Sequence, residues 1–393
     1  MLRTVSSAQE NHTNWADFIR HKTDFYVSNS PRQRTDPGFP WSQIDPPLPD
    51  PQRQDPEPPG FLDKVFGRGA PAAQAAGRSA ADDELRKTQQ RHIRNFDKAS
   101  EKLFEVRRLF ADDLSRFLFD ETIVLRLAGH NNFFGPRTYF DEVVRKTAET
   151  PFRQPGFPDT YLGVPLVDMS VAFSTLDRAF ELDLVVPQGF DVSFNTNRQY
   201  FITRDGVDFM PAKGDTVFDC GACIGENSAI FAALAGALGR VYAFDPIPLH
   251  TRFCALQGER NAGTSAPIEP VNFAVGNETE EVEGGVVEEI DAISPGGLQI
   301  SKFNITRLDD FCERYGIERV DYIKMDIEAA EPDALEGAAR ILRAHKPKLA
   351  ISTYHRPDQF WSIPLQIKEI NPEYRLYFGH HSPVRWESVV YAC

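Results

Sequence analysis

A glycine-containing stretch at residues 215–225, Asp-Thr-Val-Phe-Asp-Cys-Gly-Ala-Cys-Ile-Gly, carries the first chemical signal of the sequence. Its apolar run at 216–218 predicts a buried parallel strand that ends at Asp219. Gly221 and Gly225 then open a tight turn into an alanine-rich helical segment. A strand, a glycine turn and a helix form the unit that lays a nucleotide-like ligand against a helix N-terminus. We therefore expect a ligand-binding loop here.

The spacing within this loop indicates the kind of ligand. Asp-x-Gly-x-x-x-Gly lacks the Gly-x-Gly-x-x-Gly pattern with which a dinucleotide site approaches a pyrophosphate. An acid at the strand end and a wider loop suit a ligand without phosphates, such as S-adenosylmethionine. Asp245 ends the next predicted strand, at 240–244, where an acid accepts hydrogen bonds from the ribose hydroxyls of such a cofactor.

Three carboxylates follow the predicted strand at 322–325. If the backbone stays extended, Asp326 and Glu328 point the same way, while Glu331 caps the N-terminus of the next helix. Clustered carboxylates can act as a base, bind a divalent cation or hold the amino group of methionine. The sequence leaves these roles, and with them the metal dependence, open.

A histidine follows the predicted strand at 348–352, in the segment Tyr354-His355-Arg356. Methyl transfer from a sulfonium to a hydroxyl is an in-line displacement, in which positioning supplies much of the rate. The alcohol must also lose its proton, and a histidine near neutral pH suits that task. We expect His355 to be the base and Tyr354 to contact the substrate. A lone histidine after a strand is nevertheless often structural.

Further substrate contacts are predicted in the C-terminal loops. His380 and His381 lie in the last loop and are alternative bases or substrate contacts, although a solvated hairpin tip would also account for them. Trp361 lies near the same loops, and an aromatic face packs well against a sugar ring. Large aromatic residues more often fill a core.

The composition narrows the class of protein. The net charge of −14 argues against nucleic acid or an anionic membrane as the main partner, and no apolar stretch has transmembrane length. The N-terminus does not resemble a secretory signal, and five cysteines form no disulfide framework, so we expect a cytoplasmic protein. Cys220 and Cys223 have no partner pair for zinc and no thioredoxin-like context.

Repeated strand–helix units across residues 213–393 predict a mostly parallel α/β sheet with helices on both faces and ligands at the carboxyl ends of its strands. Upstream, 161–212 is a β-rich lead-in with a hairpin at Asp205-Gly206. Residues 81–160 are predicted to be helical, serving as a lid, a dimer surface or a substrate wall. The proline-rich residues 1–80 are expected to form a disordered or extended arm.

These residues resemble the FkbM-type family of S-adenosylmethionine-dependent methyltransferases over about residues 200–393. The matching stretches are 215–226, 241–246, 320–331, 346–358 and 377–381. The resemblance implies a class I methyltransferase fold, a Rossmann-like sheet of seven strands with one reversed. It also implies O-methylation of hydroxyls on sugars, polysaccharides or related natural products.

By position, the resemblance implies roles for individual residues. Those expected to hold the cofactor are Asp219, Gly221, Gly225, Glu226, Asp245 and Asp326. Asp326, Glu328 and His355 are expected to face the acceptor. The chain departs from the family at Ala329, where glycine is usual, and at Asp245, where glutamate is frequent.

The leading hypothesis is an O-methyltransferase acting on a small-molecule or glycan acceptor, with a homodimer left open. A nucleotide-dependent oxidoreductase is a second enzyme hypothesis, weakened by the missing third glycine. A non-catalytic scaffold with a retained cofactor site is the hypothesis from another class. A nucleic-acid methyltransferase is disfavoured because no Asn/Asp-Pro-Pro-Tyr/Phe segment follows the strand at 322–325 and the chain is acidic.

Overall fold

The computed structural model describes residues 11–29, 78–129, 160–161, 164–175, 179–187, 198–287, 298–382 and 385–393. The chain divides into two units. One comprises Met1–Glu101 and Asp120–Pro136, and the other comprises Lys102–Phe119 and Arg137–Cys393.

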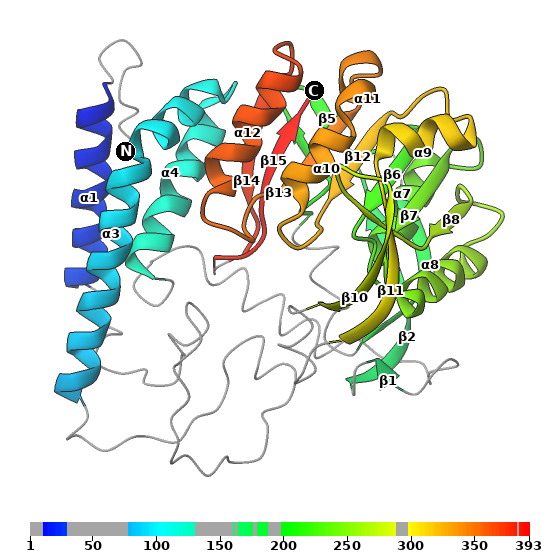
Figure 1. Ribbon diagram of the computed structural model, residues 1–393, viewed down its shortest axis with the longest axis horizontal. Helices are drawn as coiled ribbons and strands as arrows, with labels where there is room; N and C mark the ends of the chain where they lie inside the picture. Colours follow the sequence, from blue (N-terminus) through cyan, green and yellow to red (C-terminus); the bar gives the residue numbers. More distant parts are fainter. Residues whose placement is uncertain are drawn as a thin grey trace. The chain divides into compact units, whose positions relative to one another are not determined.

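The second unit is built on a seven-stranded sheet in the order β14-β15-β13-β12-β6-β7-β8 (Figure 1). Its strands are β6 (Thr216–Cys220), β7 (Arg240–Phe244), β8 (Ile268–Val271), β12 (Tyr322–Met325), β13 (Lys348–Ser352), β14 (Leu376–His380) and β15 (Ser388–Ala392). Within this sheet β15 runs antiparallel to β13 and β14, and the other pairs are parallel. The predicted fold class, a mostly parallel seven-stranded sheet with one reversed strand, is confirmed.

Helices cover both faces of this sheet because the central strands are apolar on both sides. The helices are α7 (Glu226–Ala235), α8 (Pro248–Arg260), α9 (Leu308–Tyr315), α10 (Glu331–Gly337), α11 (Ala339–Ala344) and α12 (Gln359–Ile370). Phe231 of α7 packs on Tyr322, with ring centroids 5.3 Å apart. Phe311 of α9 packs on Phe218, with centroids 6.0 Å apart. Tyr322 pairs with Val217, the residue before Phe218, so α7 and α9 lie on opposite faces.

A small second sheet interrupts the expected alternation. From the sequence, residues 269–275 are expected to form one strand, but this segment divides at Asn272 into β8 and β9 (Phe273–Val275). Asn272 donates its side-chain N–H to the carbonyl of Asp245 at 3.0 Å, which ties this break to the end of β7. β9 pairs with β11 (Leu298–Thr306), and β11 pairs with β10 (Glu280–Val287). Neither β10 nor β11 is predicted from the sequence.

The β-rich lead-in forms two small sheets. β1 (Thr160–Tyr161), β2 (Val164–Ser174) and β3 (Ala179–Pro187) form one antiparallel sheet. β4 (Ile202–Arg204) and β5 (Val207–Phe209) form an antiparallel pair around Asp205 and Gly206, both with positive φ (48° and 75°).

Helix α8 completes the hydrogen bonding of β3. Gln257 accepts from the amide of Val185 at 3.2 Å and donates to its carbonyl at 2.7 Å. Asn261, one turn later, makes the same pair of bonds to Asp183, at 3.0 and 2.9 Å. The two amide side chains therefore act as the next strand along this edge, which would otherwise present unpaired backbone groups.

The first unit contains helices packed around a tryptophan. Its helices are α1 (His12–Asn29), the first part of α3 (Arg78–Leu109) and the later part of α4 (Asp113–Ala128). Trp15 is buried, donates to Asp120 at 2.9 Å and packs its ring on Phe96 at 5.8 Å. An extended arm is thus wrong for residues 12–29, because apolar side chains of this segment have helical partners. Residues 30–77 lie outside the described part of the chain.

The end of α3 and the start of α4 belong to the second unit. Phe110 and Phe119 pack their rings on Phe378 of β14, at 5.7 and 5.3 Å. Ser115 accepts a hydrogen bond from the amide of Phe378 at 2.9 Å. None of the helices in the described ranges combines the length and the apolarity needed to cross a membrane.

Candidate active site

A buried ion pair lies beneath the site. Lys324 and Asp219 occupy paired positions on β12 and β6, and their side chains are 3% and 0% exposed. Lys324 Nζ lies 3.1 Å from Asp219 Oδ1 and donates to the carbonyl of Gly221 at 2.7 Å. Burial alone would lower the pKa of Lys324, but the charges of Asp219 and Asp326 raise it above its usual range. Ser228 of α7 donates to the other oxygen of Asp219 at 2.6 Å.

Both oxygens of Asp219 thus contact other parts of the protein. The sequence predicted a direct cofactor contact for this residue. That role stays a prediction, and the observed contacts fix the strand end, the loop carbonyl and the start of α7 relative to one another.

The loop above this pair requires glycine at two positions. Gly221 has φ of 78°, and a Cβ there would lie 1.8 Å from the carbonyl oxygen of Asp326. Gly225 has φ of 79°, and a Cβ there would lie 2.8 Å from Cα of Cys254. Both glycines are needed because the loop is pressed against the end of β12 and against α8.

The first turn of α7 carries acceptors that the described protein leaves unsatisfied. Glu226 and Asn227 are 5% and 6% exposed. Glu226 Oε1 accepts from the Asn227 side chain at 3.2 Å, whereas Glu226 Oε2 and Asn227 Oδ1 have no hydrogen-bond donor in the described structure. Burial raises the pKa of Glu226 to about 7. Buried acceptors without donors fit a ligand that brings N–H groups, such as an ammonium.

Asp245 lies at the end of β7 and is 6% exposed. Its Oδ2 accepts from the amide of Cys223 at 3.0 Å. Its Oδ1 accepts from the amide of Ile247 and lies 2.9 Å from His250 Nδ1. Since a carboxylate oxygen can accept two hydrogen bonds, Oδ2 retains capacity for a ligand hydroxyl. Asp245 is shorter than the glutamate frequent in the resembled family, and these contacts hold it against the glycine loop.

Asp326 follows β12 and collects several donors. Tyr200 donates to Oδ2 and Tyr354 donates to Oδ1, each at 2.9 Å. His355 Nε2 lies 3.3 Å from Oδ1. Burial would raise the pKa of Asp326, but the charges of His355 and Lys324 and the tyrosine hydroxyls hold it below its usual value.

His355 lies among carboxylates and is 1% exposed. Its Nε2 is 3.1 Å from Glu328 Oε2, and its Nδ1 is 3.0 Å from Glu331 Oε1. The structure thus brings together the three residues predicted to be catalytic, Asp326, Glu328 and His355. It adds Glu331, for which the sequence favoured a helix-capping role.

Asp326, Glu331 and His355 also offer donor atoms within 4.8 Å of one another, a set that could hold a metal ion by donor type. Within the described structure the Glu331 oxygens have hydrogen-bond donors, whereas the ring nitrogens of His355 lie near carboxylates without forming a hydrogen bond. Glu331 Oε1 accepts from the amide of Ile327 at 3.0 Å, and Oε2 accepts from Gln359 at 2.7 Å. Both ring nitrogens of His355 face carboxylates. The contacts of His355 with Asp326, Glu328 and Glu331 form an ion-pair network.

The residues predicted to contact substrate lie less close to one another than the predicted catalytic residues do. Tyr354 lies against the ring of His355, with centroids 4.2 Å apart. His380 Nδ1 lies 2.9 Å from Ser388 Oγ, and His381 Nε2 lies 2.7 Å from Tyr391 Oη, so both make contacts within the β14–β15 pair. Trp361 lies in the first turn of α12, and no described contact joins it to Asp326 or His355.

Three further residues of the site were not predicted. Tyr200 is buried beside Asp326, and Glu387 precedes β15 in the left-handed region, with φ of 66°. Burial and the charge of Asp326 raise the pKa of Glu387 to about 7. Both residues lie far from the motifs in sequence, so no pattern identified them. Lys324 could have been identified from the sequence, because a lysine inside an apolar strand needs a buried partner.

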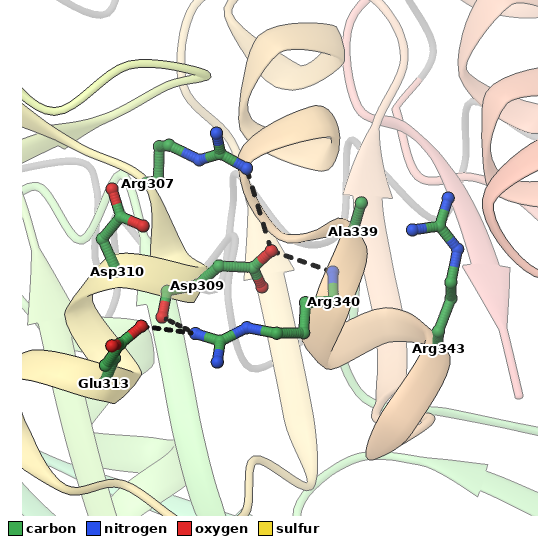
Figure 2. A pocket seen from close by; sticks show the side chains of 7 residues that line it. All are labelled: Arg307, Asp309, Asp310, Glu313, Ala339, Arg340 and Arg343. Carbon is green, nitrogen blue, oxygen red and sulfur yellow. Dashed lines mark hydrogen bonds and ion pairs between the residues drawn. The ribbon is translucent and has the colours of Figure 1, made fainter.

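A hollow elsewhere on this unit is lined by α9 and α11 (Figure 2). Its lining residues are Arg307, Asp309, Asp310, Glu313, Ala339, Arg340 and Arg343. Asp309 accepts from the amides of Arg340 and Ile341 at 2.9 and 3.0 Å, so it caps α11. Arg307 and Arg340 pair with acids here, whereas Arg343 donates to the carbonyl of Ile370, and none of the predicted site residues lines this hollow.

Comparison with known proteins identifies part of this unit. Residues 219–381 match the family model described as Methyltransferase FkbM domain. No curated protein matches the chain.

One matching solved structure is that of methyltransferase FkbM from Methylobacillus flagellatus KT, which is 20% identical to this chain. The match covers 77% of this chain and 62% of that chain, with a TM-score of 0.49. This chain therefore spans less than two thirds of that protein. The fibrillarin pre-rRNA processing protein of Methanococcus jannaschii is 13% identical, with 62% and 96% covered and a TM-score of 0.34. An O-methyltransferase from Bacillus cereus, in complex with SAH, is 13% identical, with 66% and 92% covered and a TM-score of 0.28.

We expect Gly221→Ala to destabilise the protein more than Gly214→Ala. Both glycines have positive φ, but nothing lies within 4 Å of a Cβ at Gly214. Gly214→Ala should cost about 1–2 kcal/mol for the left-handed backbone. Gly221→Ala should cost roughly 1–3 kcal/mol more, because its Cβ meets a backbone carbonyl. Urea unfolding of both variants measures the difference, and equal losses would contradict the close approach.

Proposed function

Because residues 219–381 are an FkbM-type methyltransferase domain, we propose that this protein transfers a methyl group from S-adenosylmethionine to a hydroxyl of a sugar, a polysaccharide or a related natural product. Methyl transfer follows from the family. The observation that carries the cofactor assignment is the pair of buried, unsatisfied acceptors at Glu226 and Asn227, beside the glycine loop at the carboxyl end of β6.

The residues present fit this cofactor. Glu226 and Asn227 would accept hydrogen bonds from the methionine ammonium, and Gly221 and Gly225 let the loop beside them lie directly against β12 and α8. Asp245 would accept from a ribose hydroxyl through Oδ2. When bound, S-adenosylmethionine supplies an electrophilic methyl group. The protein's part is to hold this end of the ligand in line with the acceptor.

The acceptor side is formed by the carboxylates after β12. Glu328 is 46% exposed, whereas His355, at 1%, is enclosed. A proton acceptor must reach the hydroxyl that it deprotonates. We therefore assign proton removal to Glu328, and not to His355 as the sequence suggested. Tyr354 and Asp326 lie beside Glu328 and can orient the acceptor by hydrogen bonding.

The charge of the site favours an uncharged acceptor. The cations that contact the carboxylates of the site, Lys324 and His355, are already paired with them. A phosphate or carboxylate on the acceptor would meet Asp326, Glu328 and Glu387 without a free counter-charge. Neutral hydroxyls suit this surrounding better than nucleic acid does. Five free cysteines and the acidic composition agree with a cytoplasmic location.

We expect calorimetric titration to show binding of S-adenosylmethionine and S-adenosylhomocysteine, with Kd on the order of micromolar, and no binding of NAD. Asp245→Ala should weaken binding roughly 10- to 100-fold, because a hydrogen bond to a charged group is worth about 1.5–3 kcal/mol. Asp245→Glu, the acid frequent in the family, is the matched control and should stay close to wild type. Binding of NAD alone would overturn the cofactor assignment, and unchanged affinity in Asp245→Ala would remove the ribose role.

Cofactor affinity should rise as the pH increases from 6 to 8. Burial raises the pKa of Glu226 to about 7, so the carboxyl is mostly protonated at pH 6 and mostly ionised at pH 8. The ionised carboxylate binds an ammonium more tightly than the protonated acid does. Cofactor affinity can therefore rise by at most about tenfold per pH unit. Titrations across this range should therefore show a several-fold change that Glu226→Gln abolishes. If cofactor affinity depends on pH in the same way in the wild-type protein and in Glu226→Gln, then Glu226 does not bind the ammonium.

The reaction itself is tested by transfer of a labelled methyl group to matched neutral, amino and uronate glycosides. We expect O-methylation of neutral glycosides, with the uronates poorest. Glu328→Gln should lower turnover about 10²- to 10⁴-fold, the range of general base catalysis, while keeping cofactor affinity. Glu318→Gln, an exposed position after α9, is the control and should keep full activity. Transfer only to anionic acceptors, or to none of the glycosides, would contradict the proposed acceptor class.

A further inference from the structure

Three carboxylates from two parts of the fold lie against the imidazole of His355, and the charge of a fourth also acts on it. Asp326 and Glu328 follow β12, and they lie 3.3 and 3.1 Å from Nε2. Glu331, in the first turn of α10, lies 3.0 Å from Nδ1. Glu387, before β15, also interacts electrostatically with this histidine. A neutral imidazole carries one N–H and could satisfy carboxylates on only one side of the ring.

We propose that Glu331 and His355 form a buried dyad in which the imidazole is doubly protonated and acts as a fixed cation that positions Asp326 and Glu328. The role of this dyad in catalysis rests on the proposed methyltransferase function. His355 and Glu331 are then positioning residues, and proton acceptance belongs to a carboxylate.

The contacts of Glu331 show that it is built to hold this arrangement. The residue is 0% exposed, and its two oxygens accept from the amide of Ile327 and from the side chain of Gln359. Gln359 also donates to the carbonyl of Ala329 at 3.3 Å. Glu328 and Ala329 have φ of 58° and 76°, a conformation that costs energy for residues other than glycine. Glu331 therefore fixes both the imidazole and the strained turn that carries Glu328.

The charges around the ring favour the protonated form. Asp326, Glu328 and Glu331 lie within ion-pair distance of the ring, Glu387 adds a further negative charge, and Tyr354 lies along one side. Lys324, the nearby cation, is already paired with Asp219. Burial would lower the pKa of His355, but the contacts with Glu328, Glu331 and Asp326 raise it to about 11. The imidazolium would lose its proton only as the pH rises well above neutrality.

The protonation state can be measured directly by NMR with isotope-labelled histidine, the His355 signals being assigned from their absence in His355→Gln. We expect the charged form of the ring to persist from pH 6 to 9 in the wild-type protein. Glu331→Gln should lower the titration midpoint by at least one pH unit, about tenfold in proton affinity, because the ring loses one of its anions. Glu331→Asp should restore part of the shift, and Asp333→Asn, exposed on the same helix, should leave it unchanged.

Several outcomes would overturn the proposal. One is a wild-type His355 that titrates near the ordinary histidine value of about 6.5. A second is a Glu331→Gln protein that is less stable but has an unchanged titration, since Glu331 would then be merely structural. A third is displacement of the His355 signals by Zn²⁺ or Mn²⁺ at neutral pH, which would make the ring a neutral ligand. The wild-type titration needs neither cofactor nor acceptor, so its failure is distinguishable from failure of the proposed function.

Discussion

The site depends on one buried ion pair, between Asp219 of β6 and Lys324 of β12, whose charged atoms lie 3.1 Å apart. Burying either charge alone would be unfavourable, and removing one partner of such a pair costs about 3–5 kcal/mol. The pair therefore requires β6 and β12 to be neighbours in one register. Through Ser228 and the carbonyl of Gly221 it also fixes the start of α7 and the glycine loop.

A second charged centre is arranged in a similar way on the acceptor side. Lys324 and His355 each bind carboxylates that would otherwise repel one another, and Asp326 interacts with both cations. The result is an acidic, preorganised surface whose groups are held before any ligand arrives. Such preorganisation suits a reaction in which positioning supplies much of the rate, and it complements a cationic cofactor and an uncharged acceptor.

Much of the fold could be predicted from the sequence because its signals are local. Apolar runs end at Asp219, Asp245 and Asp326, and each run proved to be a parallel strand. The predictions failed where partners are distant. The helix at 12–29 packs on other helices through contacts such as that of Trp15 with Asp120, and no local pattern reveals that contact. The strand predicted through Asn272 divides because its side chain bonds to the end of β7.

The sequence by itself determined the parallel sheet, the glycine loop and the edge at which the polar residues gather, since strand periodicity, turn chemistry and the direction of parallel strands are properties of the chain. Only the tertiary structure decided which atoms of those residues are available. Asp219 bonds to Lys324 and Ser228, and His355 is enclosed by carboxylates from β12 and α10. Tyr200 and Glu387 joined the site from segments without a motif. Burial and charge pairing arise from packing between distant segments, and they set the protonation state and role of each side chain.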